Sequence, residues 1–202
     1  MADTAFPPSS LRPLIEEVSS LLKERKETVS VAETAAGGLL SASLLCVPGA
    51  SAYFKGGLTL YTLESRLAFA DWTPEHITQY RGPTAQIVAD LAVSTRSKLL
   101  STYTVSESGT AGPGGGRAGR TPYEYAFLSF FLHTSMDVSG CAILTEDLYR
   151  GVAFIAVAAP DGKTYTREID TGFGDEREKN MLGFAAEGLK LLRDVIKGDA
   201  KL

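Results

Sequence analysis

The sequence predicts a layered α/β sandwich built as one domain. Helical and strand patterns alternate along the chain, with apolar residues at helical spacing in long segments and short β-branched or alternating runs between them. Glycine and proline clusters separate the two kinds of pattern. With 44% hydrophobic residues in 202, the chain can bury one substantial core. We therefore expect a flexible N-terminus at 1–9 and a single domain at 10–197.

The first half of the chain predicts two helix-strand alternations. Ser9 or Ser10 is expected to cap the first helix, whose apolar stripe runs from Leu11 to about Lys26. The elements expected next are a buried strand at 28–31, a small-residue turn at 32–38, an apolar helix ending before Pro48, a second strand at 57–61 and a helix opened by Thr84.

The second half continues the alternation and ends in a long helix. The expected elements are a strand at 102–106, a glycine-rich loop at 109–116, a hairpin of strands at 152–158 and 163–169, and a helix at about 176–196. The last helix places apolar residues on one face and polar residues on the other. This amphipathic pattern is what a helix packed on a sheet requires.

Composition argues against several classes of partner. The net charge is −4 and the basic residues are scattered, so neither nucleic acid nor an anionic membrane is an expected partner. The start of the chain has no secretory pattern and no apolar run reaches the ~18 residues of a membrane span, so we expect a cytoplasmic protein. Two cysteines and two histidines stand at no ligand-like spacing. No metal site is expected, and Cys46 and Cys141 are each expected to be buried and free.

Two segments that follow strands could carry chemistry. Thr34 stands between a strand and a helix, where backbone amides and the helix dipole favour anions and developing oxyanions, so its hydroxyl is either a nucleophile or a helix cap. The loop at 108–116 has glycines that would let a nucleotide approach the backbone, although a plain surface loop is the alternative. Gly114, Gly116 and Gly119 match G-x-G-x-x-G, but no helix opens there and no acidic residue is placed for a ribose, so no dinucleotide site is expected.

The segment at 32–38, Ala-Glu-Thr-Ala-Ala-Gly-Gly, resembles the A-E-S-C-T-G-G signature of the CinA C-terminal family. Residues 47–64 are similar to the family's P-G-S-S-x-x-F…G…T-Y-S-N-E stretch, and 108–113 to its S-G-I-A-G-P loop. Residues 151–158 resemble its G-T-V-Y-I-A-x-A strand, and 174–177 its G-D-R motif. Several motifs in the same order over about 10–197 are far more specific than any one of them.

The resemblance implies a fold, an activity and a site. The fold would be a three-layer α/β/α sandwich, and the activity that of a hydrolase of the pyridine nucleotide cycle, which removes ammonia from the carboxamide of nicotinamide mononucleotide (NMN) without a metal or other cofactor. A homo-oligomer is also implied. Family members use a serine nucleophile and a lysine base, which is chemically sound because a desolvated lysine can be neutral near pH 7. The implied substrate-binding residues are Glu33, Gly37, Gly38, Gly109, Thr110, Ala111, Gly112 and Arg177.

This chain departs from the family at both catalytic positions. Thr34 replaces the serine, and Arg66 replaces the lysine. A guanidinium stays protonated, so Arg66 could hold a phosphate or carboxylate but could not deprotonate Thr34. Glu33 and Tyr61 are the candidates for a substitute base; the alternative roles are a cap for Glu33 and a pocket wall for Tyr61. The open functions are an NMN amidohydrolase, a non-catalytic nucleotide-binding or interaction protein, and a hydrolase of another amide or ester.

Residues 123–150 do not fit the family pattern, in which a short turn precedes the strand at Val152. The segment contains the apolar run Phe127 to Leu132, which a surface loop rarely exposes. One hypothesis is translation of a retained intron, since removing the segment keeps the reading frame and the residues permit splice signals. The alternatives are a genuine apolar helix or hairpin that docks on the domain or a neighbouring subunit, and another error of gene structure.

Overall fold

A mixed five-stranded sheet forms the middle of the molecule in the computed structural model, which describes residues 6–113 and 150–202. The strands are β1 (Val29–Glu33), β2 (Phe54–Thr59), β3 (Tyr103–Gly109), β4 (Val152–Ala158) and β5 (Thr164–Asp170), in the spatial order β2-β1-β3-β4-β5. Strand β1 is parallel to both of its neighbours, whereas β4 is antiparallel to β3 and β5. The carboxyl ends of β1, β2 and β3 therefore lie at the same edge of the sheet.

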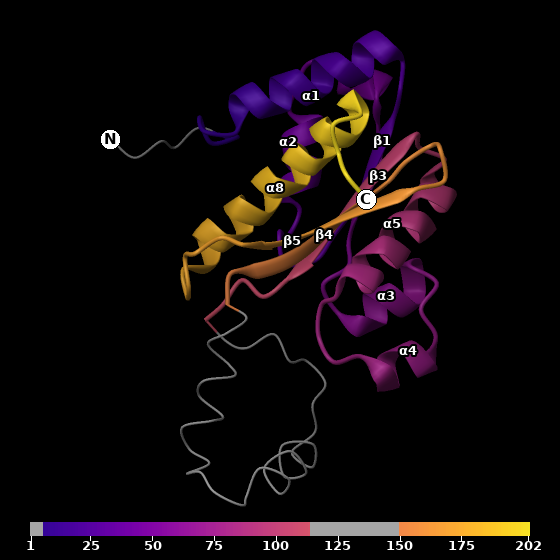
Figure 1. The fold of residues 1–202 in the computed structure, drawn as a ribbon, viewed down its shortest axis with the longest axis vertical. Coiled ribbons are helices and arrows are strands. Elements are labelled where there is room, and N and C mark those ends of the chain that lie inside the picture. Colours follow the sequence, from indigo (N-terminus) through magenta and orange to yellow (C-terminus); the bar gives the residue numbers. More distant parts are fainter. Residues whose placement is uncertain (1–5, 114–149) are drawn as a thin grey trace, which may run out of the picture.

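Helices cover both faces of the sheet (Figure 1). Helices α1 (Arg12–Arg25), α2 (Leu39–Leu45) and α8 (Arg177–Lys197) share one core with the side chains of Val31, Val105 and Ile155. Helix α5 (Ala85–Leu99) packs on the opposite face, where Val88 meets Ala156. Two short helices, α3 (Leu63–Phe69) and α4 (Pro74–Gln79), lie beside α5 (Figure 1). The predicted three-layer α/β/α sandwich is confirmed.

The strand order reverses between β1 and β3. From β1 the chain passes through α2, on one face, to β2 on one side of β1. From β2 it passes through α5, on the other face, to β3 on the opposite side of β1. In open α/β sheets, ligands bind outside the carboxyl ends of the strands at such a reversal. The topology thus selects the residues just after β1 and β3, namely Thr34 and the loop at 110–112.

Most expected elements are present, and the differences have local causes. Helices α3 and α4 were not expected, because at seven and six residues they are too short for a helical pattern. The predicted strand at 57–61 instead runs from Phe54 to Thr59, since the glycine at 56 obscured its start and the apolar pattern continues past its end. The predicted strand at 102–106 continues to Gly109. This extension brings Glu107 into the sheet.

Two smaller expectations were wrong. The first helix has Leu11 at its N-cap position without a side-chain cap, rather than Ser9 or Ser10, and begins with the help of a proline in its first turn. Cys46 is exposed rather than buried, because it caps the carboxyl end of α2, where its thiol donates to the Ser43 carbonyl. Cys141 lies outside the described residues.

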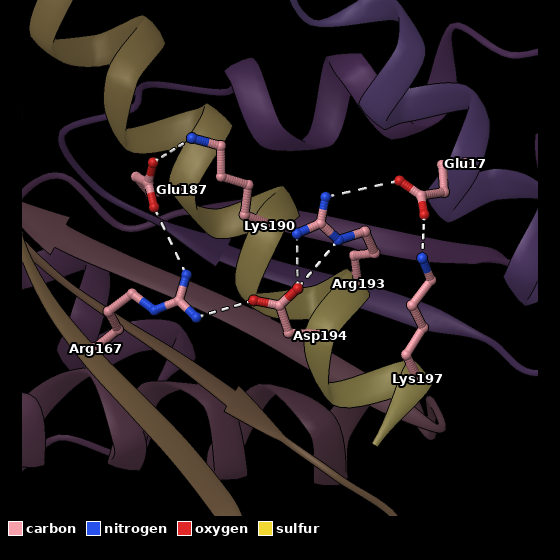
Figure 2. A network of polar contacts seen from close by, with 7 residues as sticks. All are labelled: Glu17, Arg167, Glu187, Lys190, Arg193, Asp194 and Lys197. Atoms are coloured by element: carbon pink, nitrogen blue, oxygen red, sulfur yellow. Dashed lines mark hydrogen bonds and ion pairs between the residues drawn. The ribbon is translucent and has the colours of Figure 1, made fainter. Parts of the chain in front are cut away.

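Ion pairs hold the carboxyl-terminal half of α8 against its neighbours (Figure 2). The Arg167 guanidinium of β5 lies 3.0 Å from an Asp194 oxygen and 3.6 Å from a Glu187 oxygen. On the other side, Arg193 lies 3.7 Å from Glu17 of α1. Pairs as exposed as these contribute little each, so the apolar face of α8 supplies most of the packing energy. Among the described helices, none is both long and apolar enough to span a membrane.

The connection from β3 to β4 closes tightly. The Thr110 amide donates to the Val152 carbonyl at 2.9 Å, and the Gly151 amide donates to the Thr110 carbonyl at 2.8 Å. These bonds extend the antiparallel ladder past the ends of both strands. The segment set apart by the sequence, 123–150, lies outside the described residues except for Arg150, which pairs with Asp175 at 2.6 Å. The loop is therefore already closed by residues that flank the segment.

Removal of residues 123–150 is expected to leave the domain folded. The deletion joins Pro122 to Gly151, keeps the Thr110–Gly151 bond and, of the pairs described above, loses the partly exposed Arg150–Asp175 pair, so we expect the free energy of unfolding to change by about 1 kcal/mol or less. Urea unfolding of both forms measures this difference. A loss of several kcal/mol would show that the segment packs on the domain, and transcripts that are never spliced here would contradict the retained-intron hypothesis.

Candidate active site

Thr34 lies directly after β1, at the edge selected by the topology, and is only 3% exposed. Its hydroxyl donates to the Ser108 hydroxyl oxygen of β3 at 3.2 Å. Thr34 does not cap helix α2, whose N-cap position is occupied by Gly38 in a left-handed conformation (φ +102°). Of the two roles that the sequence left open for this hydroxyl, capping is therefore wrong.

Glu33 performs the capping from within the sheet. One carboxylate oxygen accepts from the Leu40 amide at 3.0 Å, and the other accepts from the amide of Ser41 at 3.0 Å and from its hydroxyl at 2.6 Å. A carboxylate is favoured at this position because the first turn of α2 presents unpaired amides and a positive dipole end. Both oxygens of the fully buried Glu33 are thus engaged by α2. Of the two roles considered for Glu33, substitute base and cap, these contacts are those of a cap.

Glu107 was not anticipated from the sequence, yet it lies at the centre of the site. It is fully buried, and one oxygen (Oε2) accepts from the amides of Thr34 at 3.2 Å and Ala36 at 2.8 Å. The other oxygen, Oε1, is buried and has no partner among the described residues. Burial raises the pKa of this carboxyl from 4.5 to about 7, although the two amides and Arg66 act to lower it and Glu33 acts to raise it further.

The position of Glu107 explains why it escaped notice. The strand was expected to end at residue 106, and the motif of the resemblance begins at Ser108. A glutamate in a run of small and β-branched residues was the available signal, since a buried carboxylate needs dedicated donors. Those donors come from a turn more than seventy residues earlier in the chain, which no local pattern reveals.

Arg66 projects from α3 into a buried aromatic setting and is 3% exposed. Its guanidinium carbon lies 5.0 Å from the Trp72 ring centre and 5.1 Å from that of Tyr80, and its Nε donates to the Leu60 carbonyl at 3.2 Å. One terminal nitrogen, Nη1, is buried without a partner in the described part of the chain. Aromatic faces attract a cation, and a guanidinium is not a usable base in proteins.

The loop after β3 is held close to the sheet and to the start of α8. A Cβ at Gly109 would lie 2.5 Å from the Ala153 Cβ, so only glycine allows this approach to β4. The side-chain amide of Asn180 donates to the Ala111 carbonyl at 2.9 Å, and Arg177 donates to the Gly112 carbonyl at 2.8 Å. The buried Asn180 is a second residue that the sequence did not single out. Thr110, between Gly109 and Ala111, is buried as well.

The remaining predicted residues lie around this centre. Gly37 (φ +68°) passes so close to α8 that a Cβ would lie 2.9 Å from the Met181 methyl carbon. Tyr61 is 62% exposed, and its hydroxyl accepts from a second nitrogen of Arg177 at 3.5 Å. The structure thus brings Thr34 together with the 108–112 loop and joins Tyr61 to Arg177 at the surface. Arg66, which is bonded to Leu60 just after β2, lies on the side of β1 where β2 pairs with it.

The raised pKa of Glu107 predicts a pH-dependent stability. Between about pH 4.5 and 7 the folded chain keeps a proton on Glu107 that the unfolded chain has lost, so the free energy of unfolding should fall as pH rises through this window. The total change corresponds to roughly 3 kcal/mol. Glu107→Gln, which retains an oxygen for the two amides, should remove this slope. Urea unfolding at pH 5 and pH 8 compares the variant with wild type and with the exposed control Glu168→Gln; parallel pH curves for all three would contradict the prediction.

Curated relatives share much of this sequence. A CinA-like protein of Thermosynechococcus vestitus is 31% identical over 178 residues, which cover 87% of this chain and 36% of that protein. A CinA-like protein of a Cyanothece species is 38% identical over 103 residues, which cover 51% of this chain and 25% of that protein. The chain therefore spans only about a quarter to a third of the length of these relatives.

Solved structures share the fold. The competence/damage-inducible protein CihA of Agrobacterium tumefaciens superposes with a TM-score of 0.71 at 20% identity, over 94% of this chain and 97% of that one. The competence or damage-inducible protein of Enterobacter asburiae gives 0.68 at 21% identity, over 91% and 96%. At such identities the likeness concerns the fold alone.

The sequence profile of the CinA C-terminal domain matches residues 11–122. The match ends where the segment 123–150 begins, and it includes Thr34, Arg66 and the loop after β3. Because it covers more than half of the 202 residues, this chain belongs to the CinA C-terminal domain family.

Proposed function

We propose that this protein hydrolyses the carboxamide of a pyridine mononucleotide, NMN, with Thr34 as the nucleophile or as the hydroxyl that orients the attacking water. The observation that carries the proposal is the placement of the Thr34 hydroxyl, which is buried, bonded to Ser108 and located where the strand order reverses. The reaction breaks one linear amide C–N bond: water is consumed, and ammonia and a carboxylate are formed.

The two arginines suit different parts of such a substrate. Arg177 is exposed at the start of α8, next to the loop after β3, so it can meet a nucleotide phosphate that remains near solvent. Arg66 is buried close to Leu60 and suits a neutral or partly charged oxygen deeper in the site. Neither is a base, so the proton of the attacking hydroxyl must pass to another group.

Purified protein should release ammonia from NMN, and Thr34→Ala should lower the rate by about 10²-fold or more, since it removes the attacking or orienting hydroxyl. Thr34→Ser, which keeps the hydroxyl, is the matched control and should retain activity. Ammonia release is measured for forms with and without residues 123–150, and circular dichroism checks that each is folded. Equal rates for wild type and Thr34→Ala would refute the proposed role of Thr34.

A second candidate is a nucleotide-binding protein without catalysis. It is favoured by one observation: the amides of Thr34 and Ala36, which could have stabilised an oxyanion, already donate to Glu107. Arg66 also occupies the position of the family's base.

The double variant Thr34→Ser with Arg66→Lys separates the two candidates. If the protein is a decayed deamidase, ammonia release should appear only in the double variant, because a lysine at this buried position can lose its proton near neutral pH. If the wild type is an enzyme, the double variant should bring no such gain, since it loses the aromatic contacts that hold Arg66. The readout is the rate of ammonia release at saturating NMN.

A further inference from the structure

Glu107 is bonded directly to the backbone of Thr34, the residue at which the proposed reaction takes place. Its Oε2 oxygen accepts from the Thr34 amide at 3.2 Å and from the Ala36 amide at 2.8 Å. Three covalent bonds separate the Thr34 amide nitrogen from the hydroxyl oxygen, so Oε2 lies within about 7 Å of that hydroxyl. The other oxygen, Oε1, is buried without a partner in the described part of the chain. A half-satisfied carboxyl group thus lies close to the Thr34 hydroxyl.

A negative charge on Glu107 would oppose the chemistry of Thr34. Both residues are buried, and charges interact more strongly between buried groups than in water. Attack on an amide builds negative charge on the carbonyl oxygen, which a nearby carboxylate destabilises. An ionised carboxylate also holds the Thr34 and Ala36 amides more strongly than a neutral one, so these amides are less free to donate to another oxygen. Both effects slow attack when Glu107 is ionised.

The charged groups around Glu107 are few. Its register partner in β1 is Glu33, which raises the Glu107 pKa, and Arg66 of α3 lowers it. The register partner in β4 is an isoleucine, and α2 has no charged residue. Helix α8 packs on the β1–α2 turn through apolar side chains, while Arg177 at its start donates to the Gly112 carbonyl. Burial outweighs these charges and places the Glu107 pKa at about 7.

We propose that Glu107 is a positioning residue that also regulates the site: it holds the Thr34 backbone through Oε2, and attack at Thr34 is faster when Glu107 is protonated than when it is ionised. Glu107 acts through Thr34 and through its charge, without contact to the substrate. It exchanges one proton with solvent, and none of its covalent bonds to carbon changes. This inference concerns the regulation of the proposed reaction and rests on the proposed function.

The substitution Glu107→Gln separates the charge of Glu107 from its structural role. The Thr34 and Ala36 amides both donate to Oε2, so the glutamine oxygen takes that place and the turn stays held. The variant is neutral at every pH. A merely structural role predicts that the variant is equal to or slower than wild type by the same factor at every pH. The proposed role predicts that the variant becomes faster than wild type as pH rises.

The kcat for ammonia release at saturating NMN tests this prediction at pH 5.5 and pH 8. We expect the ratio of Glu107→Gln to wild type to be about one at pH 5.5, where Glu107 is protonated, and about ten or more at pH 8. The ratio cancels the titration of groups that both chains share. The control Glu168→Gln, at an exposed position of β5, should give a ratio of about one at both values.

A thiol at position 34 measures the same interaction without any turnover. The full chain carries Thr34→Cys, with Cys46→Ser and Cys141→Ser so that the introduced thiol is the only one. Its ionisation is followed by the ultraviolet absorbance of the thiolate. We expect the added Glu107→Gln to let the thiol ionise about one pH unit lower, because a neighbouring negative charge is removed. The added Glu168→Gln should leave the titration unchanged.

The two measurements distinguish the failure of the inference from that of the proposed function. A kcat ratio that is the same at both pH values, or a thiol that titrates identically with and without Glu107→Gln, would overturn the inference. If no chain releases ammonia, the proposed hydrolysis fails, and the thiol titration alone decides whether Glu107 controls the charge at position 34. Ammonia release with a constant ratio would keep the hydrolysis and refute the regulation.

Discussion

The amides of Thr34 and Ala36 donate hydrogen bonds to the Glu107 carboxylate. These bonds join the end of β3 to the turn that leads from β1 into α2. They cross between two parallel strands at the point where the strand order reverses. Without them, the two amides of the turn would need other hydrogen-bond acceptors in a buried environment. The location of the Thr34 hydroxyl, and with it the chemistry open to the site, depends on this contact.

Two glutamates at matched positions have different roles because of what surrounds them. Glu33 and Glu107 are register partners in neighbouring parallel strands, and both are fully buried. Glu33 faces the first turn of α2, which donates to both of its oxygens. Among the described residues, Glu107 has donors at one oxygen only, and its pKa is raised. The same side chain is thus a structural cap in one strand and a half-satisfied, titratable group in the next.

The sequence predicted those parts of the fold that depend on local patterns. Thr84 opens α5 and caps it through the Ile87 amide, and the hairpin of β4 and β5 closes around the predicted turn. The site was predictable to the extent that it follows motifs, as for Thr34 and the loop after β3. Glu107 and the setting of Arg66 were not, because their partners come from distant segments: amides of the β1–α2 turn for the first, and Trp72 and Tyr80 for the second.

The central claim is that the edge between β1 and β3 holds the carboxamide of a nucleotide. A crystal structure of the Thr34→Ala chain with NMN tests it most directly. We expect the carboxamide to lie beside residue 34, close to Ser108 and to the loop after β3. A nucleotide bound elsewhere, or bound here with its carboxamide turned away from residue 34, would contradict the proposal.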